Sequence, residues 1–216
     1  MDFARARDLM VETQVRTNDV TDQRVLHAMR TLPRERFLPA QRRALAYADL
    51  EVEVAPGRTL MRPRDLSKLI QALAPAAGER ALEIAGATGY GAAVLALCCK
   101  DVVALDPDPN LSFAAQAAFE ASGLANTKTA STAAALGWAD GAPYDVIMVS
   151  GSAEIVPDAW LGQLAPGGRL GVIVRNGAAG SARIYTRSGD AVAFRAVFDA
   201  APPVAPGLER PAAFAF

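Results

Sequence analysis

The stretch Arg80–Asp106 constrains the fold more than any other part of this sequence. It predicts a short apolar strand over residues 80–84, followed by a turn of small residues at 85–90. An Ala/Leu/Val helix is expected over 91–99, and a second strand over 100–105 ends at Asp106. This pattern is typical of nucleotide-binding folds, in which small turn residues let a ligand approach the backbone and a carboxylate about 20 residues later binds ribose hydroxyls.

The rest of the chain continues to alternate between strands and helices. Helices are expected over 110–122 and 157–164, strands over 127–130, 145–150 and 169–175, a loop over 176–181, and a hairpin from 182–187 and 191–198. Strands that alternate with helices predict an α/β fold. We expect a Rossmann-like, doubly wound, mostly parallel sheet that ends in an antiparallel edge hairpin.

The first 75 residues predict a helical cap rather than more of the sheet. Helices are expected over 2–16, from a Thr21 cap to Pro33, over 39–46 and from Pro63 onward, with a half-exposed strand at 50–54. We therefore expect a single domain made of a helical cap and substrate segment (1–75), a Rossmann-like core (76–200) and an extended tail (201–216).

Composition limits the possible partners. The 216 residues are 51% hydrophobic and 21% charged, and 22 Lys and Arg nearly balance 23 Asp and Glu, for a net charge of −1. This balance argues against a surface for nucleic acid or anionic membranes, although arginines cluster in 5–43 and 58–64. The sequence contains neither an apolar signal core at its start nor an apolar run of about 18 residues, so we expect a cytoplasmic protein. One histidine and the adjacent Cys98 and Cys99 predict no metal site.

Five stretches resemble the protein-L-isoaspartate O-methyltransferases. They are MVETQVR (10–16) with TDQRVL (21–26), PRERFLP (33–39) with AYAD (46–49), LEI (82–84) with TGYGAAVLA (88–96), YDVIMVS (144–150) and LAPGGRL (164–170). The resemblance implies a cytoplasmic, monomeric enzyme that transfers a methyl group from S-adenosylmethionine to the α-carboxylate of an isoaspartyl residue in damaged proteins or peptides. The resulting ester would collapse to a succinimide and reopen in part as aspartate, which is a repair reaction.

The resemblance also identifies the residues beside the methyl acceptor. The family segment Gly-x-Thr-x-Ser-x-Pro corresponds to residues 57–63, where Thr59 matches and Met61 replaces the serine. A thioether does not donate a hydrogen bond, so we expect Met61 to be inactive in catalysis. Thr59 or Arg62 are the alternatives for holding the acceptor carboxylate.

The cofactor positions implied by the resemblance are Glu83, Ala85, Gly86, Ala87, Gly89, Asp106, Ala133 and Ser150. Two of them, Ala85 and Ala87, stand where the family has glycine, and their methyl groups are expected to face the ligand. Ala133 occupies the place of an acid that contacts adenine, and the sequence has no acid between Glu120 and Asp140. Asp106 is the ribose candidate and Asp108 the second choice, while the alternative is that this Asp-Pro-Asp-Pro turn only caps the next helix.

Two functions stay open from the sequence. One is an active S-adenosylmethionine-dependent methyltransferase. The other is a non-catalytic or repurposed binding or regulatory protein on the same fold, because the departures coincide at functional positions while the core pattern is intact.

Overall fold

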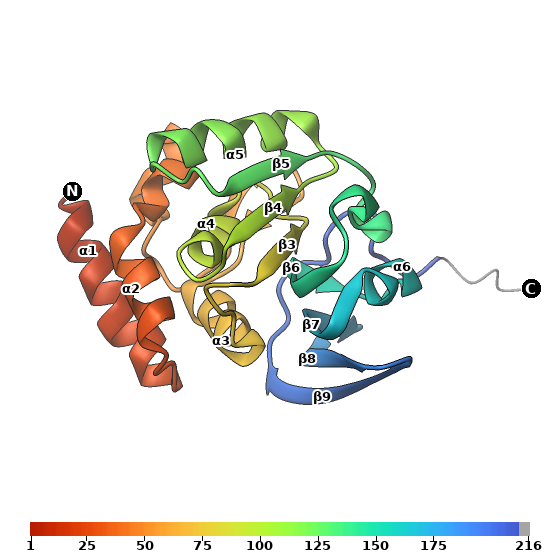
Figure 1. The fold of residues 1–216 in the computed structure, drawn as a ribbon. Coiled ribbons are helices and arrows are strands. Elements are labelled where there is room, and N and C mark those ends of the chain that lie inside the picture. The colour runs from red at the N-terminus through yellow and green to blue at the C-terminus, as the bar shows by residue number, and fades with distance from the viewer. Residues whose placement is uncertain (212–216) are drawn as a thin grey trace, which may run out of the picture.

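A seven-stranded sheet forms the centre of the protein in a computed structural model that describes residues 1–211 (Figure 1). The rest of the predicted tail, 212–216, lies outside the described residues. The strands follow the order β5-β4-β3-β6-β7-β8-β9, parallel from β5 to β7 and antiparallel in β8 and β9. Their bounds are β3 Arg80–Ile84, β4 Asp101–Leu105, β5 Thr127–Ala130, β6 Tyr144–Ala153, β7 Leu164–Asn176, β8 Ala179–Ser188 and β9 Ala191–Asp199. The predicted mostly parallel sheet with an antiparallel edge is therefore confirmed.

The strand order reverses beside β3, which pairs with β4 on one side and with β6 on the other. The chain leaving β3 runs to β4 on one side, and the chain leaving β6 runs to β7 on the other, so a crevice opens between the carboxyl ends of β3 and β6. Ligands of open α/β sheets bind at such a point. The turn that begins at Ala85 and the residue Ser150 of β6 both lie at this edge.

Apolar side chains alternate between the two faces of the sheet. In β3 and β6, Ala81 and Met148 join one cluster, while Leu82 and Ile147 join the other. The first cluster includes residues of α1 Phe3–Met10, α2 Gln23–Thr31, α3 Pro63–Leu73, α4 Tyr90–Ala96 and α5 Pro109–Ala121. The second is covered by Trp160 of α6 (Asp158–Gly162) and by Leu208 of the C-terminal tail. Both faces are buried, as a doubly wound fold requires.

The N-terminal cap forms as expected, with two differences. The helix α2 begins after Asp22, which accepts a hydrogen bond from the amide of Arg24, so Asp22 caps it in place of the predicted Thr21. A short carboxylate one residue closer to the first turn fulfils the same capping role. The segments Val11–Val15, Arg16–Asn18, Arg34–Phe37 and Ala40–Leu45 form π or 3-10 turns rather than regular α-helix.

A separate two-stranded hairpin, β1 Val52–Ala55 and β2 Arg58–Leu60, connects the cap to α3. At the other end of the chain, the loop predicted over 176–181 is wrong. Asn176 pairs with Ala179 across a tight turn in which Gly177 has a φ of +62°, so β7 and β8 are joined by a hairpin turn.

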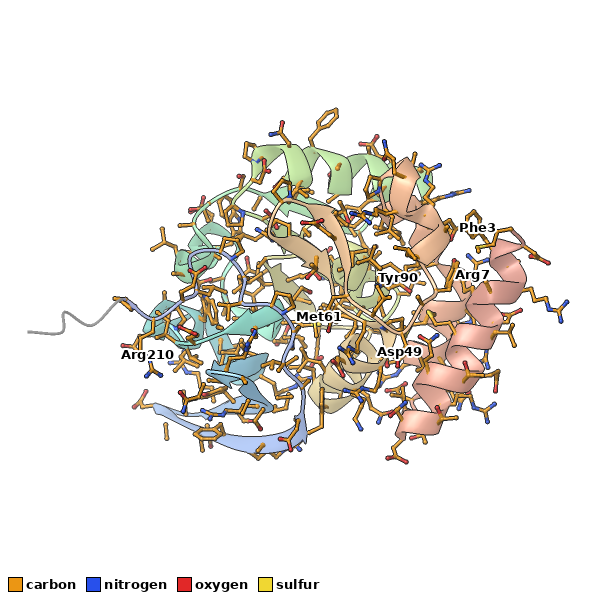
Figure 2. All side chains as sticks on the ribbon, turned by 180° about the vertical axis from the view of Figure 1, so that it is seen from behind. Phe3, Arg7, Asp49, Met61, Tyr90 and Arg210 are labelled. Carbon is orange, nitrogen blue, oxygen red and sulfur yellow. The ribbon has the colours of Figure 1, made fainter. Side chains whose placement is uncertain are left out.

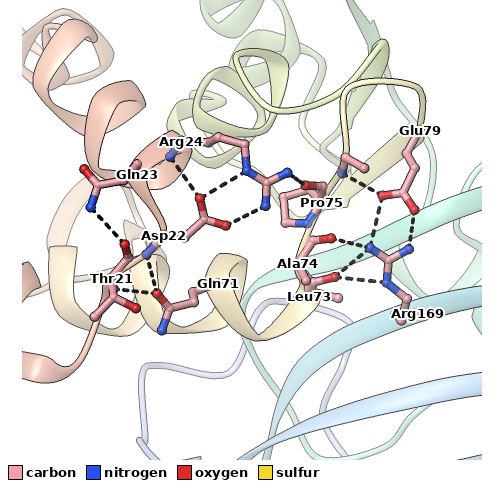
Figure 3. A network of polar contacts seen from close by, with 11 residues as sticks. Thr21, Asp22, Gln23, Arg24, Gln71, Leu73, Ala74, Pro75, Glu79 and Arg169 are labelled. Carbon is pink, nitrogen blue, oxygen red and sulfur yellow. Dashed lines mark hydrogen bonds and ion pairs between the residues drawn. The ribbon is translucent and has the colours of Figure 1, made fainter.

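Polar contacts join α2, α3 and β7 (Figure 3). The side-chain oxygen of Gln71 accepts hydrogen bonds from the amides of Thr21 and Asp22. Arg169 of β7 donates to the carbonyl oxygens of Leu73 and Ala74 at the end of α3. In the described part of the chain, no helix has the length and apolarity that crossing a membrane requires.

Candidate active site

The turn after β3 keeps a backbone shape that favours glycine. Ala85, Ala87 and Gly89 have φ values of 58°, 52° and 81°, all in the left-handed region. An alanine in this region costs about 1 kcal/mol. Both alanines are only 2% exposed and pack into apolar clusters, so their methyl groups are covered while the crevice is closed. The family-type turn is therefore retained although two of its glycines are not.

Glu83 of β3 holds this turn in place through hydrogen bonds. Its carboxyl group is fully buried and accepts hydrogen bonds from the amide of Ala92 (2.9 Å) and from Oγ of Ser150 (2.5 Å). Burial raises the pKa of Glu83 to about 7. A Cβ at Gly86 would lie 2.3 Å from Oε2 of Glu83, and one at Gly91 would lie 2.1 Å from Oε1. A methyl group at either position would therefore displace the Glu83 carboxyl group from its present hydrogen bonds.

Asp106 follows β4 and faces the same turn. Its Oδ2 accepts a hydrogen bond from the amide of Ala87 (2.7 Å), and its Oδ1 accepts one from the amide of Asp108 (3.0 Å). The carboxyl group is 2% exposed, and this burial raises its pKa although Arg58 counteracts the shift. Asp108 instead caps α5 through the amide of Asn110. The capping interpretation therefore holds for Asp108, whereas Asp106 occupies the position expected of a ribose ligand.

The hairpin of β1 and β2 brings a cation to Asp106. Arg58 of β2 is 7% exposed and forms an ion pair with Oδ2 of Asp106 through Nη2. No local sequence pattern relates Arg58 to Asp106, because the two residues are 48 positions apart. In the sequence, Arg58 is marked only by its position inside residues 57–63, which we call the acceptor segment.

The acceptor segment lies against the same crevice, with Met61 and Tyr90 close to the middle of the molecule (Figure 2). Met61 is 3% exposed and joins the apolar cluster, so no hydroxyl stands at the family's serine position. Its carbonyl oxygen accepts a hydrogen bond from Arg34, whose guanidinium lies 4.6 Å from the centre of the Tyr90 ring. Arg62 is paired with Glu51 and with Asp65. Thr59 is half-buried and lies at the crevice, so Thr59 is the better placed alternative.

Two small cavities mark the crevice. One of about 10 Å³ is lined by residues including Thr59, Met61, Glu83, Gly86 and Ser150. The other, also about 10 Å³, lies between the hairpin, the end of β6 and the tail residues 203–205. The structure therefore brings most of the predicted site residues together. Ala133 is exposed and lines neither cavity.

Comparison with known proteins identifies the family. Residues 5–199 match the family model described as protein-L-isoaspartate (D-aspartate) O-methyltransferase. The chain belongs to this family. It is 40% identical over 168 residues to protein-L-isoaspartate O-methyltransferase 1 of Rhodopseudomonas palustris, covering 78% of this chain and 69% of the relative. It is 41% identical over 169 residues to the Methylorubrum populi enzyme, covering 78% of each.

Solved structures of the protein-L-isoaspartate O-methyltransferase family share the fold. One of them superposes with a TM-score of 0.81 at 23% identity, covering 94% of this chain and 67% of the other. A Plasmodium falciparum structure of the same type, solved in complex with S-adenosyl-L-homocysteine, gives a TM-score of 0.79 at 16% identity and covers 93% of this chain and 98% of the other. These likenesses establish the N-terminal cap and the sheet as one family architecture.

Proposed function

We propose that this chain is an S-adenosylmethionine-dependent protein-L-isoaspartate O-methyltransferase. Family membership supports the reaction, and one observation carries it to this chain. Asp106 stands at the carboxyl end of β4 and accepts the amide of Ala87 from a turn that keeps three left-handed residues. A buried carboxylate beside such a turn, at the point where the strand order reverses, is the arrangement that binds a nucleoside.

The residues present fit the chemistry of the cofactor in part. Asp106 would hold the ribose hydroxyls, and the turn 85–89 would approach the nucleoside with its backbone. Glu83 and Ser150 would hold the turn in place through their 2.5 Å hydrogen bond. Ala133 supplies no charge for the adenine, so recognition of the base rests on contacts other than a carboxylate. When bound, S-adenosylmethionine supplies a methyl group on a sulfonium.

The acceptor carboxylate is held by Thr59 in this proposal. Methyl transfer to a carboxylate needs orientation more than acid–base chemistry, because the carboxylate is already a nucleophile at neutral pH. A hydroxyl at Thr59 donates one hydrogen bond to it, whereas the buried Met61 gives only shape. The missing serine is expected to lower the rate, since a hydrogen bond to a charged group contributes about 1.5–3 kcal/mol.

The substrates in this proposal are proteins and peptides that contain isoaspartyl residues, and the enzyme acts as a cytoplasmic monomer. We propose neither a nucleic acid nor a membrane as a partner, because the net charge of the protein is −1.

Incubation with an isoaspartyl peptide and S-adenosylmethionine labelled on the methyl group tests the reaction. We expect base-labile methyl ester on the isoaspartyl peptide and none on the same peptide with aspartate. Asp106→Ala should weaken the binding of S-adenosylhomocysteine at least about tenfold, since it removes the ribose ligand. Asp108→Asn is the matched control, because asparagine also caps a helix. An inactive protein that binds no S-adenosylhomocysteine would refute the proposal.

A further inference from the structure

The ion pair between Arg58 and Asp106 occupies the place where the nucleoside has to bind. Nη2 of Arg58 contacts Oδ2 of Asp106, and the same oxygen accepts the amide of Ala87. The two side chains are 9% and 3% exposed, so solvent hardly screens the pair. The remaining oxygen, Oδ1, accepts the amide of Asp108. Both oxygens of Asp106 are thus engaged by the protein itself.

The volume of the cavities leads to the same conclusion. The two cavities at the crevice measure about 10 Å³ each, and Arg58 lines one of them. A pocket for a ligand of nucleoside size measures about 300 Å³ or more. The larger cavities of the described chain lie elsewhere, such as one of about 530 Å³ beside the turn that joins β7 to β8. The crevice at the carboxyl ends of β3 and β6 therefore has to open before a cofactor enters.

The hairpin that carries Arg58 is built to allow this. Strands β1 and β2 pair only with each other and form a two-stranded sheet apart from the central one. An isolated two-stranded hairpin has little stability of its own. Gly57, which precedes Arg58, has a φ of +70° and no atom within 4 Å of its Cβ position. The turn before Arg58 is therefore unpacked, whereas Val52 and Leu60, both buried in an apolar cluster, anchor the two strands.

We propose that Arg58 competes with the cofactor for Asp106 and so sets the affinity of this site. In the free protein Asp106 binds Arg58. In the complex Asp106 binds the ribose, and the Arg58 side chain turns toward solvent. Because only the molecules with Arg58 displaced are competent to bind, the apparent dissociation constant is raised by the inverse of their fraction. This inference rests on the proposed function, since it takes Asp106 as the ribose ligand.

Calorimetric titration with S-adenosylhomocysteine tests the competition. We expect Arg58→Ala to bind at least about tenfold more tightly than the wild type, because the variant has no competing cation and has an open crevice. Arg58→Lys keeps a competing charge and should gain much less. Arg42→Ala is the matched control, because Arg42 pairs at 3.6 Å with Glu53 on the exposed side of the same hairpin and does not reach Asp106. Its affinity should equal that of the wild type.

The outcomes separate this inference from the proposed function. If the wild type binds and Arg58→Ala binds equally or more weakly, Arg58 is no competitor, while the methyltransferase proposal stands. If neither protein binds, both proposals fail. Urea unfolding shows whether Arg58→Ala is folded. As a test that needs no variant in the binding step, the side-chain Nε–Hε resonance of Arg58, assigned from its loss in Arg58→Lys, should shift when the wild type is saturated with S-adenosylhomocysteine. An unchanged resonance would overturn the competition.

Discussion

Glu83 connects three elements of the site through one carboxyl group. It belongs to β3, accepts the amide of Ala92 in α4 and accepts the hydroxyl of Ser150 in β6. Burial raises its pKa to about 7 from an ordinary value of 4.5, although the hydrogen bonds from Ser150 and Ala92 counteract the shift. The site therefore contains a carboxyl group whose pKa lies near neutrality, beside the turn that is to receive the cofactor.

The raised pKa of Glu83 predicts how stability depends on pH. Between pH 4.5 and 7 the folded protein keeps a proton that the unfolded chain has released. The free energy of unfolding should therefore fall as pH rises through this window, by about 3 kcal/mol in total, and level off above it. The glutamine in Glu83→Gln has no proton to release. Between pH 4.5 and 7 the free energy of unfolding of this variant should therefore fall by about 3 kcal/mol less than that of the wild type. Urea unfolding at half-unit pH steps measures both curves.

Burial also raises the pKa values of Asp65 and Asp106, so only the difference between the variant and the wild type is assigned to Glu83. Asp22 and Glu79 have lowered pKa values, owing to the hydrogen bond from Arg24 and to bonds from Arg169 that outweigh burial, so their contributions vary below about pH 4.5. Comparing Glu83→Gln with the wild type cancels the contributions of the other acids to the free energy of unfolding. Parallel curves for the two proteins between pH 4.5 and 7 would show that Glu83 is ionised in the fold.

At the residue scale, the sequence predicted what local patterns encode. Asp106 was identifiable because strand, turn and helix precede it at a fixed spacing. Arg58 was not, because its importance arises from a tertiary contact with a residue 48 positions away. Gly86 lies out of phase with the motif, and its close approach to the Glu83 carboxyl group is a tertiary detail that the motif does not encode. The motif identified Ala85 and Ala87 as the positions that replace glycine, and the structure shows that both keep the left-handed backbone.

At the element scale, most predicted bounds agree with the structure, since hydrophobic periodicity and prolines determine them. The helix α3 is an example, because Pro63 begins it and its buried side chains lie on one face. Its end was less predictable. Ala74 follows α3 in a left-handed conformation, with a φ of 48°, although glycine is the residue that this position favours. Arg169 stabilises this end by donating to the Leu73 and Ala74 carbonyl oxygens (Figure 3).

We therefore expect Ala74→Gly to stabilise the protein by about 1 kcal/mol. The change relieves the left-handed alanine, and no buried methyl group is lost, because Ala74 is exposed. The carbonyl oxygen that Arg169 binds is unaffected. The measurement is the urea midpoint at constant m-value.

Ala72→Gly provides the matched control for this helix end. It makes the same substitution two residues earlier, inside α3, where glycine should cost about 1 kcal/mol. The two variants should therefore move the urea midpoint in opposite directions. Equal destabilisation by both would mean that the helix continues through Ala74.

At the scale of the whole molecule, segments from three distant parts of the chain surround the crevice. The hairpin supplies Arg58 and Thr59, β6 supplies Ser150 and Gly151, and the tail supplies residues 203–205. The tail is attached to β6 by hydrogen bonds from the amide of Ser152 to the carbonyl of Pro203 and from the amide of Ala205 back to Ser152. Further along, the carbonyl of Leu208 accepts the amide of Glu154, and the Leu208 side chain is fully buried. The position of this wall therefore depends on an anchor outside the crevice.

Leu208→Ala tests whether that anchor holds the tail as a unit. Removing a fully buried leucine side chain should cost about 2–5 kcal/mol, because the cavity that remains is only partly refilled. The described part of the tail, up to residue 211, forms no helix and few backbone hydrogen bonds, so we expect the loss to appear first as local opening. Hydrogen exchange of the Ser152 and Ala205 amides should then accelerate more than that of amides in β3 and β4. Leu136→Ala, at a position 59% exposed, is the control and should change neither stability nor exchange by more than about 0.5 kcal/mol. Equal acceleration across the whole sheet would instead mean that the tail and the sheet unfold together. The tail side of the crevice would then open only when the whole domain unfolds.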